Sequence, residues 1–154
     1  MCNIKIRHAS ISDKNEYISM AKAFYATDAV MHPIPDQYFE DAFSEVLRSD
    51  DFARCYIIEI DGIIAGYGLT ARTFSQEAGG ITVFIEELYI KEGFRSRGAG
   101  KCFFEYLFNE EKTARRYRLE VEETNPRAIE LYEKLGFEFL EYKQMYLEVA
   151  NKKD

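Results

Sequence analysis

The chain has 154 residues, 47% of them apolar and 15% aromatic, which is enough for one domain with a sizeable core. We therefore expect residues 1–154 to form a single domain. The 27 acidic and 20 basic side chains leave a formal net charge of −7, which argues against non-specific binding to nucleic acid and against an anionic membrane surface.

The first third of the sequence predicts one strand and two helices. The segment NIKIRHA alternates apolar and polar residues, as a half-buried strand does. A helix follows, because Ser10 or Ser12 can cap it and apolar side chains recur at helical spacing to about Thr27. Two prolines in MHPIPDQ then interrupt the helical pattern. A second helix is predicted from about Asp36 to Ser49.

The middle of the sequence predicts three strands. Two apolar, β-branched runs in ARCYIIEIDGIIAGYGLTAR meet at Asp61 and Gly62, a pair that readily adopts the positive φ angles of a tight hairpin turn. A second turn, SQEAGG, leads into the strand ITVFIEELYI. Because this strand is apolar on both faces, we expect it to lie in the centre of a sheet.

The last third alternates helices and strands. A helix is predicted from Gly98 to about Lys112, and the strand YRLEVEE follows it. The next helix, in NPRAIELYEKLGF, has both ends marked, by Asn125 as the cap with Pro126 in the first turn and by Gly136 just past the last turn. The segment FEFLEYKQMYLEV is expected to form one or two final strands. This order of elements predicts a mixed α/β sheet with helices packed on it.

Cysteine content and hydropathy bear on the compartment. Cys2, Cys55 and Cys102 are scattered and form no C-x-x-C pair, so neither a disulfide framework nor a metal site is indicated. The segment MCNIKIRHAS lacks the apolar core of a signal peptide, and no run reaches the roughly 18 apolar residues of a membrane span. We expect a cytoplasmic protein that uses no metal.

A basic, glycine-containing loop lies in FRSRGAGKCFF, between a predicted strand and a predicted helix. Unpaired backbone N–H groups at a helix N-terminus favour phosphate. This is not a P-loop, because Arg95 stands where that motif has its first glycine and Cys102 where it has the metal-binding hydroxyl. A G-x-G-x-x-G dinucleotide motif is absent too. Taken alone, the loop fits a phosphate site and an ordinary turn into a helix equally well.

Two motifs together resemble the GNAT superfamily of acyl-CoA-dependent N-acyltransferases. Arg95-x-x-Gly98-x-Gly100 matches the R/Q-x-x-G-x-G/A loop of that superfamily, and it follows the strand EELYI as the family requires. NPRAIELYEKLGFE resembles the family segment N-x-x-A-x-x-L/F-Y-x-x-x-G-F, at the expected distance after YRLEVEE. The resemblance implies a mixed, largely antiparallel sheet flanked by helices.

The resemblance also implies acetyl-CoA as a co-substrate. In the family the loop binds the pyrophosphate of coenzyme A, while the preceding strand and an asparagine bind its pantetheine arm. Carried over residue by residue, the coenzyme-binding positions here are Leu88, Tyr89, Ile90, Arg95, Ser96, Arg97, Gly98, Ala99, Gly100, Lys101 and Asn125.

Acetyl transfer to an amine needs a base for the ammonium proton, whose pKa is roughly 10, and an acid for the departing thiolate. Comparison with polyamine-acetylating members places Glu86 at the position of a water-linked base and Glu87 at that of a substrate-binding carboxylate. Tyr132 occupies the general-acid position of the family. His32 stands in the loop that, by resemblance, would wall the acceptor pocket. Each has an alternative: a solvated or ion-paired glutamate, a core tyrosine or a loop histidine.

The interpretation is an N-acetyltransferase that moves the acetyl group of acetyl-CoA to a primary amine of a small molecule, by direct attack in a ternary complex. Two alternatives stay open: a CoA-binding or regulatory module without turnover, and a protein N-terminal or lysine acetyltransferase. Many relatives pair through their C-terminal strands, and LEYKQMYLEV is apolar enough to do so, so we also expect a homodimer.

Overall fold

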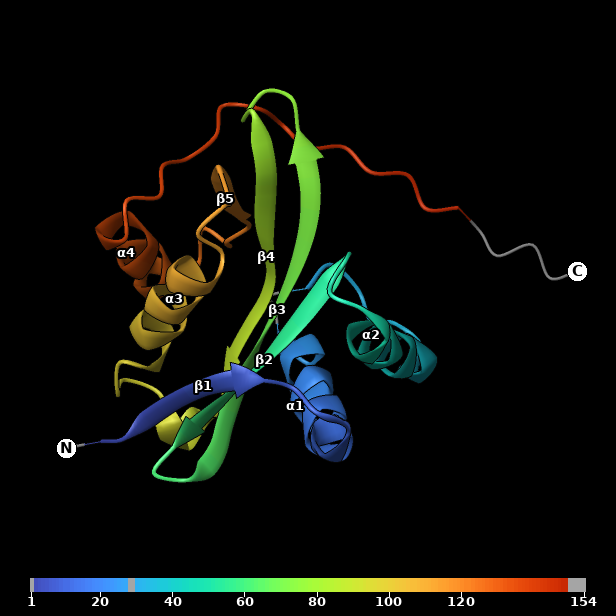
Figure 1. The fold of residues 1–154 in the computed structure, drawn as a ribbon, viewed down its shortest axis with the longest axis vertical. Helices are drawn as coiled ribbons and strands as arrows, with labels where there is room; N and C mark the ends of the chain where they lie inside the picture. The colour runs from blue at the N-terminus through green and yellow to red at the C-terminus, as the bar shows by residue number, and fades with distance from the viewer. Residues whose placement is uncertain (1, 28–29, 150–154) are drawn as a thin grey trace, which may run out of the picture.

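The computed structural model describes residues 2–27 and 30–149 and contains one five-stranded sheet (Figure 1). Strands β1 to β4 pair with one another in chain order and antiparallel, and β5 joins the far side of β4 in parallel. The predicted mixed, largely antiparallel sheet is therefore confirmed. The strand ITVFIEELYI, which was expected away from the edge, is in β4 and lies between β3 and β5. The strands are β1 (Ile4–His8), β2 (Ala53–Ile60), β3 (Ile63–Ser75), β4 (Gly80–Ile90) and β5 (Arg116–Leu119).

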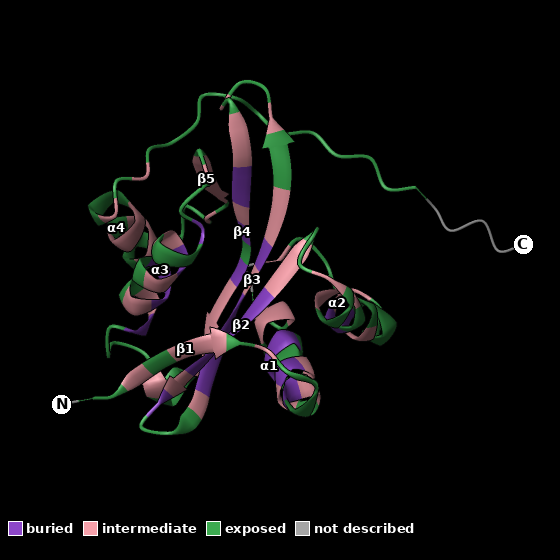
Figure 2. Ribbon diagram, viewed as in Figure 1, coloured by how far each residue is buried: buried purple, intermediate pink, exposed green. Residues whose placement is uncertain are grey.

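The helices cover the two faces of this sheet. Helices α1 and α2 pack on one face and α3 and α4 on the other, and each pair covers its own buried apolar cluster (Figures 1 and 2). Short 3-10 turns precede α1 and α3. No helix in the described part of the chain has the length and apolar character needed to cross a membrane. The helices are α1 (Lys14–Tyr25), α2 (Asp36–Arg48), α3 (Ala99–Glu110) and α4 (Pro126–Lys134).

Two glycines set the geometry of the central hairpin. Asp61 and Gly62 join β2 to β3 with φ angles of 52° and 80°, the left-handed pair expected for a tight turn. Further along β3, a Cβ at Gly68 would lie 2.3 Å from the ring of Phe103. Gly68 therefore gives the fully buried Phe103 room against the sheet and lets α3 lie close to it.

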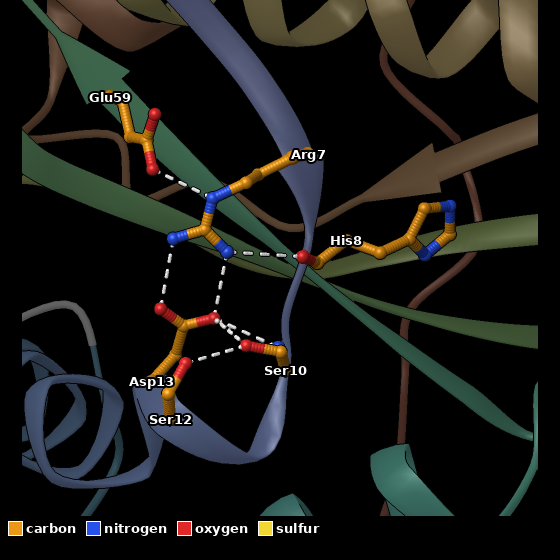
Figure 3. Close-up of polar contacts among 6 residues, drawn as sticks. All are labelled: Arg7, His8, Ser10, Ser12, Asp13 and Glu59. Carbon is orange, nitrogen blue, oxygen red and sulfur yellow. Dashed lines mark hydrogen bonds and ion pairs between the residues drawn. The ribbon is translucent and has the colours of Figure 1, made fainter. Parts of the chain in front are cut away.

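A polar clamp connects the start of α1 to the sheet (Figure 3). The guanidinium of Arg7 on β1 donates hydrogen bonds of 2.7 and 2.9 Å to the two carboxylate oxygens of Asp13, and its Nε donates one of 2.7 Å to Glu59 on β2. Asp13 also accepts a hydrogen bond from the backbone N–H of Ser10, which completes a capping box. The Asp13 side chain is 4% exposed, so this pair is shielded from solvent.

The C-terminal prediction is wrong. Residues 137–149 form no strand in the structure, and β5 contains only three residues of the longer strand YRLEVEE that was expected. An apolar segment needs a partner strand to become a sheet strand, and this chain offers it none within the described residues. The segment runs away from α4 and leaves large apolar side chains in solvent (Figure 2): Phe139, Leu140, Tyr142, Met145, Tyr146, Leu147 and Val149.

Candidate active site

A β-bulge interrupts β4 at Glu86. Leu69 of β3 lies opposite Glu87, and the next residue, Thr70, lies opposite Ile85, so Glu86 is an extra residue without a partner on β3. The bulge breaks the simple alternation of side chains along the strand. Ile85 packs in the cluster under α3 and α4, whereas Glu87 is buried among the tyrosines on the α1 side. The two adjacent glutamates therefore differ in burial, Glu86 being exposed and Glu87 buried.

The pairing between β4 and β5 ends at the same bulge. They pair only over Thr82–Ile85 and Arg116–Leu119, and β4 then continues to Ile90 with β3 alone beside it in the described structure. Strand separation leaves main-chain N–H and C=O groups of β4 without a ladder partner, and an extended ligand with amide groups can pair with them. Leu88, Tyr89 and Ile90 lie on this stretch, although the Ile90 carbonyl already accepts a 2.9 Å hydrogen bond from Arg95.

Electrostatics distinguish the two glutamates. Partial desolvation raises the pKa of Glu86, and the nearby negative charges of Glu87 and Glu120 raise it further. Burial also raises the pKa of Glu87, while hydrogen bonds from Tyr67 and Tyr25 oppose that rise. A carboxylate with a raised pKa is a stronger base than an ordinary one, so Glu86 has the exposure and the basicity to accept a proton.

The glycine loop opens α3 with left-handed backbone. Gly98 is the N-cap residue with a φ of 84°, and Ser96 has a φ of 67°, which is unusual for a residue with a side chain. The first N–H groups of α3 have no partner within the helix, and they lie where the helix dipole is positive. Such a turn suits a bound anion such as a pyrophosphate.

Basic side chains are arranged around this loop. Arg97 donates a 3.1 Å hydrogen bond to the carbonyl of Gly93, and its guanidinium lies over the ring of Phe94. Arg127, from the first turn of α4, donates a 2.8 Å hydrogen bond to the hydroxyl of Ser96. Lys101 on α3 is exposed and lies 3.6 Å from Glu105. Together with Arg95, these cations make the loop region locally positive in an acidic protein.

Gly100 has a packing role in this loop. A Cβ at Gly100 would lie 3.0 Å from the side chain of Leu131 on α4. Gly100 therefore lets α3 and α4 approach each other. At Gly98 a Cβ would meet open space, and the left-handed φ is what makes a glycine favourable there.

Asn125 and Tyr132 lie on the helix that flanks the loop. The Asn125 side chain caps α4 by accepting a 3.2 Å hydrogen bond from the N–H of Ala128, which leaves its amide N–H groups available to another acceptor. The Tyr132 ring packs edge-on against Phe104 and Phe137. Burial raises the pKa of the Tyr132 phenol, so it keeps its proton at neutral pH and can act as a donor.

His32 lies apart from these groups. Its ring is exposed in the loop between α1 and α2, where Nδ1 is 3.2 Å from the Pro33 carbonyl and Nε2 is 2.9 Å from Glu148 of the C-terminal segment. These contacts raise the pKa of His32. In the part of the chain that the structure describes, no hydrogen bond or ion pair joins His32 to Glu86 or Glu87. The same residues contain no group of three His, Cys, Asp or Glu side chains arranged to hold a metal ion.

The sequence profile of the acetyltransferase (GNAT) family matches residues 18–137, most of the chain and both motifs of the site. The chain belongs to the GNAT family. It is accordingly an acetyl-CoA-dependent N-acetyltransferase. This conclusion agrees with the glycine loop, the bulged strand and the parting of β4 from β5.

Curated relatives and solved structures agree with this assignment. The chain is 27% identical over 153 residues to thialysine N-epsilon-acetyltransferase of Mus musculus and 26% identical over 151 residues to that of Sus scrofa, each match covering 88% of this chain and 85% of the relative. An aminoglycoside N-acetyltransferase solved with CoA has the same fold, with a TM-score of 0.76, 19% identity and 97% of each chain covered. An integron cassette protein from a salt-marsh metagenome reaches a TM-score of 0.79 at 21% identity, over 94% of this chain and 90% of its own.

Sequence reasoning missed two parts of this GNAT site. Tyr67 was not singled out, although a tyrosine in a buried strand needs a partner for its hydroxyl, and that partner is Glu87 at 2.5 Å. Arg127 was not among the coenzyme-binding positions that the resemblance implied, yet it donates a hydrogen bond to Ser96 of the glycine loop. Its position in the first turn of a capped helix beside the loop was the available signal.

Proposed function

We propose that this GNAT protein transfers the acetyl group of acetyl-CoA to a primary amine of a small cationic molecule, by direct attack in a ternary complex. The observation that supports the proposal is the bulge at Glu86, an exposed carboxylate with a raised pKa that comes directly after the last residue of β4 paired with β5. The curated relatives are named for acetylation of thialysine, itself a small amine.

Acetyl-CoA supplies an acetyl thioester, and the residues of the loop and strand suit its binding. The N–H groups at the start of α3, with Arg95, Arg97, Lys101 and Arg127 nearby, would hold the pyrophosphate. The main chain of Leu88–Ile90 and the free amide N–H of Asn125 would hold the pantetheine arm. The exposed cations and the left-handed turn at Gly98 are what support this fit.

The remaining residues have distinct roles in transfer. Glu86 takes a proton from the acceptor ammonium, directly or through water, so that the amine has a free lone pair. Tyr132 gives its phenol proton to the departing sulfur. Glu87 attracts the positive charge of the acceptor, and His32 forms part of the wall of the acceptor pocket. The acidic group of Glu86, Glu87 and Glu120 supports a cationic acceptor.

The experiment is a panel of amines assayed for thiol release from acetyl-CoA. The panel contains diamines, amino acids with side-chain amines, an aminoglycoside and a peptide with a free N-terminus. Turnover with small cationic amines supports the proposal. Turnover with the peptide alone would make the chain a protein N-terminal acetyltransferase, and coenzyme binding without any turnover would make it a binding module.

We also propose a homodimer formed through the C-terminal segment, residues 137–149. Seven large apolar side chains of this segment are exposed in the single chain. Burying them against a second copy would remove this apolar surface from water, which favours association.

A further inference from the structure

Glu87 is a buried carboxylate whose hydrogen-bond partners are neutral. The residue is 8% exposed, and its Oε2 accepts a 2.5 Å hydrogen bond from the hydroxyl of Tyr67. The side chain of Tyr25, at the end of α1, also favours the charged form of Glu87 and lowers its pKa. Among the described residues no lysine, arginine or histidine forms an ion pair with Glu87. Buried carboxylates are normally paired with a cation. Glu87 has no such partner among the described residues, so a positively charged ligand could pair with it.

The Tyr67 hydroxyl is held rigidly. Its side chain is fully buried. Its ring packs edge-on against Tyr17 at a centroid distance of 5.2 Å, and it lies tilted against Tyr89 at 6.1 Å. The Tyr25 ring packs edge-on against Phe39 of α2 at 5.2 Å. Because packing fixes the Tyr67 ring, its hydroxyl holds the Glu87 carboxylate in one orientation, with little rotamer freedom to lose on binding.

We propose that Tyr67 and Tyr25 are positioning residues that keep Glu87 ionised and oriented to pair with the ammonium group of the acceptor. This inference rests on the proposed function and adds two residues that act through Glu87 without touching the reacting atoms. A hydrogen bond donated to a carboxylate stabilises its charged form, and a buried carboxylate without such donors would take up a proton instead.

The neighbouring groups support this division of roles. Burial and the charge of Glu87 raise the pKa values of Tyr17, Tyr25 and Tyr67, so all three phenols stay neutral and remain donors. Burial likewise raises the pKa of Cys55 on β2, which keeps its thiol uncharged. Phe39 and Phe43 of α2, which pack in the same cluster, carry no charge. Glu86 is an acidic neighbour of Glu87, and its negative charge makes a cation more favourable still.

The test compares Tyr67→Phe with Tyr17→Phe. Tyr17 is equally buried in the same cluster, and no hydrogen bond joins its hydroxyl to Glu87 in the described structure, so it controls for loss of a buried hydroxyl. Removing the Tyr67 donor destabilises the charged form of Glu87 and therefore raises its pKa. A hydrogen bond to a charged group corresponds to about one pH unit, or about tenfold in the ionisation equilibrium.

Two measurements are made on each variant. Carbon-13 NMR of the Glu87 carboxyl, assigned with Glu87→Gln, follows its ionisation directly. The pH dependence of kcat/KM for a cationic acceptor, at saturating acetyl-CoA, follows its role. In Tyr67→Phe both transitions should move to higher pH by about one unit, with the loss at neutral pH mainly in the acceptor KM and recovery at alkaline pH. Tyr25→Phe should also move both transitions to higher pH. It provides the test if the Tyr67→Phe protein fails to fold.

Each other result is decisive. An NMR transition that does not move in Tyr67→Phe, or that moves equally in Tyr17→Phe, overturns the positioning role. A moved NMR transition with an unmoved rate profile shows that the charge of Glu87 does not serve the acceptor, and also overturns it. A wild-type protein that binds acetyl-CoA but acetylates no amine contradicts the proposed function itself, which separates that failure from the other two.

Discussion

The two faces of the sheet build their halves of the candidate site in different ways. On the α3 and α4 face, the glycine loop presents backbone N–H groups through a left-handed turn at Gly98 and a capped helix at Asn125. On the α1 and α2 face, the proposed acceptor half is made of buried side chains, with Glu87 held by a hydrogen bond from Tyr67. The comparison indicates that the coenzyme half depends on local backbone conformation, whereas the acceptor half depends on long-range packing.

The largest expected effect follows from changing the loop backbone. Gly98→Glu should abolish acetyl-CoA binding, because the new side chain occupies the loop and adds negative charge beside the phosphates. Gly62→Glu is the matched control: Gly62 has a similar φ of 80° and similarly open surroundings, but it lies in the β2–β3 turn. Calorimetry should find binding unchanged in the Gly62 variant. Equal affinity in a folded Gly98 variant would place the coenzyme elsewhere.

Tyr132→Phe tests the proposed general acid, which lies on α4. The ring and its contacts with Phe104 and Phe137 remain, so thermal stability should barely change. Turnover should fall by about ten- to ten-thousand-fold, the range for loss of a proton-transfer partner. Tyr106→Phe on α3 serves as a control, since it also removes a phenol hydroxyl. If Tyr132→Phe turns over at the wild-type rate, Tyr132 is a packing residue.

Glu86→Gln and Glu87→Gln separate the base from the charge that attracts the acceptor. The raised pKa of Glu86 means that it holds a proton to a higher pH than an ordinary carboxyl, so the acid limb of the wild-type rate profile should lie above the usual range of a glutamate. Glu86→Gln should lower kcat by about a hundredfold at neutral pH, with partial recovery as alkaline pH supplies free amine. Glu87→Gln should instead raise the acceptor KM. Exchanged phenotypes would reverse the two roles.

Asp13→Asn tests how much the polar clamp of Arg7, Asp13 and Glu59 contributes to the free energy of unfolding. Arg7 lowers the pKa of Asp13 from 3.8 to about 2, so the clamp stabilises the folded protein above pH 4 and is lost as the pH falls through about 2. The shift corresponds to about 2 kcal/mol at neutral pH. Urea unfolding should show this loss in Asp13→Asn and a flatter acid dependence. Glu45→Gln, which removes an exposed pair with Arg48, should change neither.

The smallest effect on activity is expected from the C-terminal segment. Replacing Met145 and Leu147 together by Glu should convert a two-chain particle into a single chain in sedimentation, because charge would be buried in the proposed interface. Acetyl-CoA binding should be unchanged, since the glycine loop is formed within one chain. Lys143→Glu in the same segment is the control. A wild-type protein that sediments as one chain would contradict the dimer.

The turns and helix ends of the proposed coenzyme half could be predicted from the sequence because their signals are local. Gly98, Asn125, Pro126 and Gly136 fix turns and helix ends through their own φ angles and side chains, and the motif spacing follows from them. The acceptor half could not be derived in the same way. Tyr67 meets Glu87 only because β3 and β4 pair in a register that includes a bulge, and no residue type in ITVFIEELYI marks where the extra residue falls.

The prediction of C-terminal strands was wrong for a related reason. Residues 137–149 are rich in apolar and aromatic side chains, as strands are, but composition alone does not supply the neighbouring strand that makes a β-strand stable. Helix α4 was predicted closely because a helix satisfies its own backbone hydrogen bonds. The difference is between an element that is complete in itself and one that depends on a partner.

The bulge at Glu86 also fixes how many residues this part of the chain can have. Downstream of it, every side chain of β4 is one position out of phase with the strand before it, and Leu88 and Ile90 face the α3 side because of that shift. Removing or adding one residue between Ile85 and Ile90 would invert the faces of everything up to the glycine loop. This stretch should therefore accept almost no insertions or deletions, so its length is constrained independently of which side chains it carries.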